Sequence, residues 1–161
     1  MYNEAAQCYS QALTKGGTQM STEENKAIVR RFFQVWGKGD LGVIDELASP
    51  ELSVYYPTFP QTIKGGEAFK TFLKEFRSAI TDPNLDEEEE IAEGDKVVIS
   101  WSFSGTHQGT LGGIPPTGKK VNWTGITIYR IADGKVIEEK GEEDSLALMR
   151  HGLIPPVEQS K

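Results

Sequence analysis

Cysteine is almost absent from this sequence, since Cys8 is the single one among 161 residues. One cysteine excludes an intrachain disulfide and a cysteine-based metal cage, and it favours a reducing compartment. We therefore expect a cytoplasmic location. The two histidines, His107 and His151, are not clustered and show no metal-ligand spacing, so we expect no metal site.

Long apolar runs and an excess of basic residues are also missing. No run approaches the ~20 residues of a membrane span, and the N-terminus lacks the basic-then-apolar pattern of a signal peptide. Lysine and arginine number 17 against 24 aspartates and glutamates, which gives a net charge of −7 and a pI of about 4.9. This charge argues against nucleic acids and polyanionic substrates. We expect no nucleic-acid or membrane partner, and a neutral or hydrophobic ligand.

The length and composition predict one globular domain. A chain of this size buries roughly two-thirds of its unfolded surface, and 37% hydrophobic residues with 9% aromatics supply a core. Residues 1–20 differ from the rest and end in a glycine pair before a second methionine, so we expect a poorly ordered extension there. The domain is expected over residues 21–156, followed by a tail at 157–161.

Three helices are expected in the N-terminal half. Ser21 and the acidic residues after it are typical of a helix start, and apolar residues then recur at spacings of three and four up to Trp36. The glycines of the segment 37–42 match the Gly-x-Gly-x-x-Gly spacing of nucleotide-binding loops. A helix precedes them instead of a strand, so we interpret them as a helix end and a turn before a short helix.

After a strand around residues 52–56, a third helix carries an apolar stripe with Phe69, Phe72 and Phe76 on one face. Such a stripe is typical of a core, and in a cone-shaped fold it can also wall a cavity. Residues 81–84 are expected to form a turn. The acidic run 86–90 is expected at a solvated strand edge, where charge discourages aggregation.

The second half of the chain alternates apolar and polar residues, which predicts three long strands at about 96–109, 119–131 and 135–144. No βαβ rhythm is present, so the pattern indicates an α+β fold with a largely antiparallel sheet. The connection 105–118 is rich in glycine and proline, which marks a long loop between two strands. Loops of this length usually carry function.

Several blocks of this half resemble one known family. They are Ile-Ala-Glu-Gly-Asp-Lys-Val-Val from residue 91, Gly-Thr-His-Gln-Gly from 105, Ile-Pro-Pro-Thr-Gly-Lys from 114, Asp-Gly-Lys-Val-Ile-Glu from 133 and Asp-Ser-Leu-Ala-Leu-Met from 144. Their order and spacing resemble the SnoaL-like polyketide (ester) cyclases of the nuclear transport factor 2-like superfamily, over roughly residues 21–156. The resemblance implies a cone-shaped barrel in which a curved, mostly antiparallel sheet wraps around three N-terminal helices. It also implies an aldol-type ring closure by acid/base catalysis that needs no metal or other cofactor.

The same resemblance makes Asp144 the candidate catalytic acid/base. Side chains alternate along a strand, so if Asp144 points inward, Lys140 and Glu142 point inward with it and are candidate substrate-binding residues. The alternative is that this segment lies in water and that Asp144 only caps the helix beginning at Ser145. His107 is a candidate hydrogen-bond partner of a substrate carbonyl or of Asp144, although a lone strand histidine is usually structural.

The walls of a substrate pocket are expected to be aromatic and apolar. The candidates are Trp36, Tyr56, Phe72, Trp101, Trp123 and Met149. Two positions differ from many relatives, because Lys140 stands where an aromatic residue is common and Glu143 stands where tyrosine is common. Both differences make the site more polar.

Two functions remain open from the sequence. The first is a cofactor-independent cyclase, or a related acid/base enzyme, that acts on a small hydrophobic carbonyl compound. The second is a non-catalytic module that binds a small ligand or forms dimers on the same scaffold, since function resides in sites and not in folds. Val98, Ile126 and Ile128 lie on the strand face away from the core, so we expect a homodimer or a larger homo-oligomer.

Overall fold

The computed structural model describes residues 20–154. The expected tail at 157–161 and nearly all of the expected N-terminal extension lie outside these residues. The elements in chain order are α2 (Thr22–Phe33), η1 (Gln34–Trp36), α3 (Gly42–Leu47), β1 (Ala48–Tyr55), β2 (Ile63–Lys64), α4 (Gly66–Ala79), β3 (Ile80–Glu93), β4 (Lys96–His107), β5 (Lys120–Ala132), β6 (Lys135–Glu143) and α5 (Ser145–His151).

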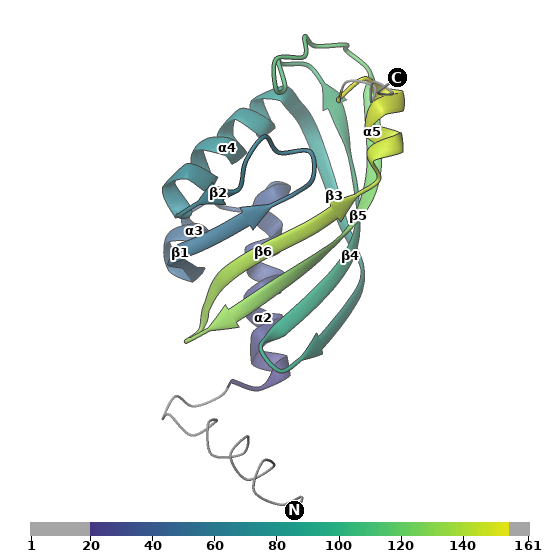
Figure 1. Ribbon diagram of the computed structural model, residues 1–161. Coiled ribbons are helices and arrows are strands. Elements are labelled where there is room, and N and C mark those ends of the chain that lie inside the picture. The colour runs from purple at the N-terminus through teal and green to yellow at the C-terminus, as the bar shows by residue number, and fades with distance from the viewer. Residues whose placement is uncertain (1–19, 155–161) are drawn as a thin grey trace, which may run out of the picture.

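The strands form one six-stranded sheet in the order β2-β1-β6-β5-β4-β3. Neighbouring strands are antiparallel except β1 and β6, which are parallel. Figure 1 shows the sheet curving around α2 and α4, with α5 and the loop between β4 and β5 together at one end. The expected α+β fold, a curved and mostly antiparallel sheet with N-terminal helices on one side, is confirmed.

The first helix begins where the sequence predicts it. The Ser21 hydroxyl accepts from the Glu24 amide, and the Glu24 carboxylate accepts from the Ser21 amide, which completes a capping box. The helix continues as η1 and ends at Gly37. Gly39 then donates its amide to the Gln34 carbonyl, so the glycine-rich segment is a helix end and turn as expected.

The predicted turn at residues 81–84 is wrong, because this segment belongs to β3. The pairing of β3 with β4 shifts register between Thr81 and Asn84, and Asp82 has a positive φ of 50°. Such a bulge accommodates Pro83, which cannot donate a ladder hydrogen bond. The acidic run 86–90 does lie on the edge strand, as expected, and most of its residues are exposed.

The core lies between the concave face of the sheet and the helices. Val97, Ile99, Trp101 and Phe103 of β4 are all buried, which confirms the alternation expected for this strand. On α4, Phe69 and Leu73 are fully buried. The rest of the phenylalanine stripe, together with rings from other elements, surrounds a cavity at the end of the sheet that carries α5.

Candidate functional site

A cavity of about 160 Å³ opens between α4, the inner face of the sheet and the loops at that end. Its lining is mostly aromatic and aliphatic. The lining residues are Trp36, Tyr56, Thr58, Phe59, Pro60, Phe72, Phe76, Trp101, Phe103, Leu111, Gly112, Trp123, Glu143, Leu148, Leu153 and Ile154. A cavity of about 150 Å³ with apolar walls holds one benzene molecule. The site therefore fits a molecule built on about one ring.

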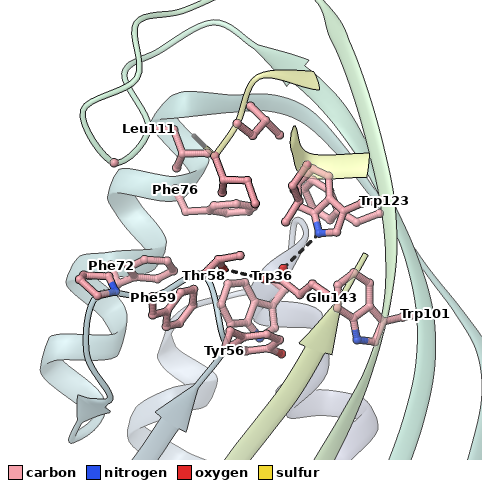
Figure 2. A pocket seen from close by; sticks show the side chains of 16 residues that line it. Trp36, Tyr56, Thr58, Phe59, Phe72, Phe76, Trp101, Leu111, Trp123 and Glu143 are labelled. Atoms are coloured by element: carbon pink, nitrogen blue, oxygen red, sulfur yellow. Dashed lines mark hydrogen bonds between the residues drawn. The ribbon is translucent and has the colours of Figure 1, made fainter. Parts of the chain in front are cut away.

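Glu143, the last residue of β6, is the only one of these lining residues with a carboxyl group. The other ionisable group of the lining is the Tyr56 hydroxyl. Its Oε2 accepts from the Thr58 hydroxyl at 2.7 Å, and its Oε1 accepts from Trp123 Nε1 at 3.2 Å. Figure 2 shows both interactions and the ring of aromatic side chains around the carboxylate. Thr58, from the loop after β1, and Trp123, from the neighbouring strand β5, hold the carboxylate in one orientation.

Burial raises the pKa of Glu143 above its ordinary value, and the nearby charge of Glu142 raises it further. The hydrogen bonds from Thr58 and Trp123 act in the opposite direction but do not cancel the effect of burial. A carboxylate with a raised pKa is a stronger base than a free one, which suits it to proton transfer near neutral pH.

Residues 140, 142 and 144 do not face inward, which is the orientation that a catalytic Asp144 would require. Lys140 and Glu142 are exposed, whereas Glu139 and Gly141 are buried and Glu143 borders the cavity. The reason is a bulge in β6: Arg130 pairs with Glu138, but Ile131 pairs with Val136, so the strand contains one extra residue. One inserted residue moves every later side chain to the opposite face.

Asp144 is exposed and serves as the N-cap of α5. Its Oδ1 accepts from the Ala147 amide at 2.9 Å. It borders a shallow hollow outside the cavity, together with Glu142 and Thr124. The structure thus shows the alternative that the sequence left open, a helix cap, and the catalytic role of Asp144 stays a prediction without a contact to support it.

His107 is fully buried at the end of β4 but does not line the cavity. Its Nδ1 lies 3.3 Å from the Thr117 hydroxyl, and its backbone pairs with the end of the β4–β5 loop. The structure does not bring His107 to Asp144. The Asp144 amide donates to the Thr124 carbonyl, and Thr124 pairs with Ser102 on β4. His107 lies five residues further along β4 than Ser102, a distance of about 16 Å at the rise per residue of a strand.

The aromatic wall predictions agree with the structure. Trp36, Tyr56, Phe72, Trp101 and Trp123 all border the cavity. Met149 does not border it, because the turn of α5 directs the neighbouring Leu148 there instead. Whether these residues bind a substrate stays a prediction.

Sequence reasoning missed the lining from the loops, above all Thr58 and Leu111, and it missed two glycines that make room for the walls. A Cβ atom on Gly141 would lie 2.0 Å from Tyr56 Cε1, and one on Gly125 would lie 2.3 Å from Trp101 Cζ2. Glycine is therefore required at both places for the two rings to lie against the sheet. An unexplained glycine inside a predicted strand is the signal that could have revealed this.

The described part of the chain, residues 20–154, contains neither a metal cage nor a membrane-spanning helix. No group of three His, Cys, Asp or Glu side chains in this part of the chain is arranged to hold a metal ion. No helix in this part is long and apolar enough to cross a bilayer.

Comparison with known proteins connects this geometry to a family. The family model for the SnoaL-like polyketide cyclases matches residues 26–152. No curated protein sequence matches the chain significantly.

Solved structures give the same result. A protein from Jannaschia sp. CCS1 assigned as a SnoaL-like polyketide cyclase is 29% identical, with a TM-score of 0.75 over 87% of this chain and 100% of that one. AclR from Streptomyces galilaeus, assigned as a hydroxylase, is 28% identical, with a TM-score of 0.69 over 86% and 87% of the two chains. TsrD from Streptomyces laurentii is 27% identical, with a TM-score of 0.71 over 81% and 96%. The chain therefore belongs to the SnoaL-like polyketide cyclase family, and its structure has the nuclear transport factor 2-like fold.

Proposed function

We propose that this protein is an acid/base enzyme of the cyclase type and that Glu143, not Asp144, transfers the proton. The observation that carries the proposal is the Glu143 carboxylate, which is held by Thr58 and Trp123 inside an otherwise apolar cavity. A positioned general base is worth about 10²–10⁴-fold in rate. The family and the named relatives support a cyclase or a related reaction.

The chemistry follows from the position of the carboxylate. The Glu143 carboxylate takes a proton from the carbon next to a substrate carbonyl, and the electron pair of the broken C–H bond moves onto the carbonyl oxygen. The resulting enolate attacks a second carbonyl of the same molecule and forms the new C–C bond. Glu143 then returns its proton to the alkoxide oxygen, so the carboxylate is regenerated.

The cavity also limits the substrate. Its walls offer few polar groups besides those already bonded to Glu143, and the protein carries a net charge of −7. A neutral carbonyl compound of about one ring fits these walls, whereas a flat compound of several fused rings exceeds the volume. The proposed substrate class is therefore a small, neutral carbonyl compound.

The experiment uses 1-phenylpropan-2-one, a neutral ketone with one ring and slowly exchanging benzylic protons. In deuterated buffer, the wild-type protein is expected to accelerate exchange of these protons, as followed by NMR. Glu143→Gln should reduce the acceleration by about 10²–10⁴-fold, because the amide cannot accept the proton. Asp144→Asn is the matched control and should leave it unchanged, since asparagine caps a helix as well as aspartate.

The second candidate function is a binding module without catalysis. It is favoured by one observation, the helix-capping role of Asp144 at the position where the family resemblance places its acid/base. The same experiment separates the two functions. Saturable binding of the ketone without any exchange in the wild-type protein would favour the module, and equal exchange in Glu143→Gln and wild type would contradict the role of Glu143.

A further inference from the structure

Three aromatic residues of the cavity wall, Trp36, Tyr56 and Trp101, form hydrogen bonds with two buried side chains that do not border the cavity, Glu139 and Thr127. Trp36 Nε1 donates to Glu139 Oε1 at 2.6 Å, and the Tyr56 hydroxyl donates to the same oxygen at 2.8 Å. Trp101 Nε1 donates to the Thr127 hydroxyl at 2.9 Å, and that hydroxyl lies 3.0 Å from the Tyr56 hydroxyl. The three rings are thus joined to one another by a single hydrogen-bond network.

The donors in this network run in one direction. An indole N–H can only donate, so the Thr127 oxygen accepts from Trp101 and its own proton is free to point at the Tyr56 oxygen. Tyr56 in turn donates to Glu139, which also accepts from Trp36. The chain of donors therefore ends on one carboxyl oxygen, and removing either the carboxyl or the hydroxyl leaves a buried donor without a partner.

Glu139 and Thr127 are both 0% exposed and lie on the inner faces of β6 and β5. Neither borders the cavity. A buried carboxyl group is costly to the fold, and an apolar residue of similar size is usually cheaper. Stability therefore does not explain the presence of Glu139. The hydrogen-bond network that it completes offers another explanation, because the three aromatic residues in this network all border the cavity.

We infer that Glu139 and Thr127 are positioning residues that fix the spacing of Trp36, Tyr56 and Trp101 and so set the size of molecule that the cavity accepts. The inference rests on the cavity being the substrate site of the proposed function, but not on Glu143 being the base. The three rings come from η1, from the residue directly after β1 and from β4, and the hydrogen bonds join them across β5 and β6. Without these bonds, each ring is free to tilt away from the cavity, which enlarges it.

The test compares the affinity of two neutral ketones by calorimetry: 1-phenylpropan-2-one, with one ring, and 1-(2-naphthyl)propan-2-one, with two. The wild-type protein should bind the smaller ketone and discriminate against the larger. Thr127→Val removes only the hydroxyl, and Glu139→Met removes only the acceptor. Both should lower the preference for the smaller ketone about tenfold, the size of effect expected for one interaction of about 1.4 kcal/mol.

Conservative variants and a matched control make the result specific. Thr127→Ser and Glu139→Gln keep the hydroxyl and the acceptor oxygen, so both should keep the wild-type preference. Thr124→Val removes a hydroxyl from the exposed face of the same strand and should also keep it. A preference that is unchanged in Thr127→Val and Glu139→Met, or equal weakening of both ketones, would overturn the inference.

A measurement on the wild-type protein covers the case in which the variants do not fold. The Trp36 indole N–H bonds to Glu139, so its NMR resonance should titrate with that carboxyl group. An ionised carboxylate holds Trp36 and Tyr56 more strongly than a neutral acid. Saturation with 1-phenylpropan-2-one should therefore move the midpoint of this titration to lower pH, and an unchanged midpoint would contradict a positioning role. Neither measurement requires turnover, so both can be interpreted even if Glu143 is not the catalytic base.

Discussion

Replacement of Glu139 by glutamine is expected to change how the stability of this protein depends on pH. Burial raises the pKa of Glu139 from 4.5 to about 7, although hydrogen bonds from Tyr56 and Trp36 act in the opposite direction. The folded protein therefore binds the proton more tightly than the unfolded chain does. The stability that this carboxyl group contributes is fully present below about pH 4.5, and it is lost as the pH rises through about 7.

The size of the effect follows from the two pKa values. One pKa unit corresponds to about 1.4 kcal/mol, so the complete change is on the order of 3 kcal/mol. This is a large part of the net stability of a typical domain, which is about 5–15 kcal/mol. Glutamine keeps the acceptor oxygen for Trp36 and Tyr56 but cannot ionise, so Glu139→Gln lacks this loss.

The measurement is urea unfolding of both proteins at closely spaced pH values between acid and mildly alkaline conditions. The difference in unfolding free energy, variant minus wild type, should increase by roughly 3 kcal/mol across this range. The amide group can also change the unfolding free energy by the same amount at every pH, and such a change does not affect the pH dependence of the difference. Glu138→Gln, on the opposite face of β6, is the matched control and should run parallel to wild type. If the curves of Glu139→Gln and wild type are also parallel, the carboxyl group is not held as described.

Two further predictions concern packing and assembly. Gly141→Ala should lower the unfolding free energy by about 1–3 kcal/mol, because its Cβ would lie 2.0 Å from the Tyr56 ring. Thermal melting of this variant is compared with that of Lys140→Ala, a control at an exposed position. Equal melting temperatures of the two variants would contradict the prediction. The outer face of the sheet places the exposed Ile91, the half-buried Val98 and the exposed Ile128 in one row across three strands. We therefore expect a dimer through this face at micromolar concentration. Sedimentation should show that Ile128→Lys is a monomer, and a wild-type monomer would disprove the proposed interface.

Much of the fold could be predicted because it depends on local patterns. The capping box at Ser21 and the alternation along β4 are properties of neighbouring residues, and both elements begin where these patterns place them. The aromatic cavity wall was also predictable, because large rings on the inner face of a strongly curved sheet have no other place to pack. The turn predicted at residues 81–84 failed because a bulge can carry Pro83 within an edge strand.

The sequence by itself determined the family, the order of the elements and the aromatic character of the cavity. Only the tertiary structure decided which acid enters that cavity. The extra residue in β6 is visible only in its pairing with β5, and it exchanges the faces of Glu143 and Asp144. The same shift buries Glu139 behind the wall, where residues from distant parts of the chain supply its hydrogen bonds. Strand alternation predicts which side chains share a face, but the register between strands decides which face is buried.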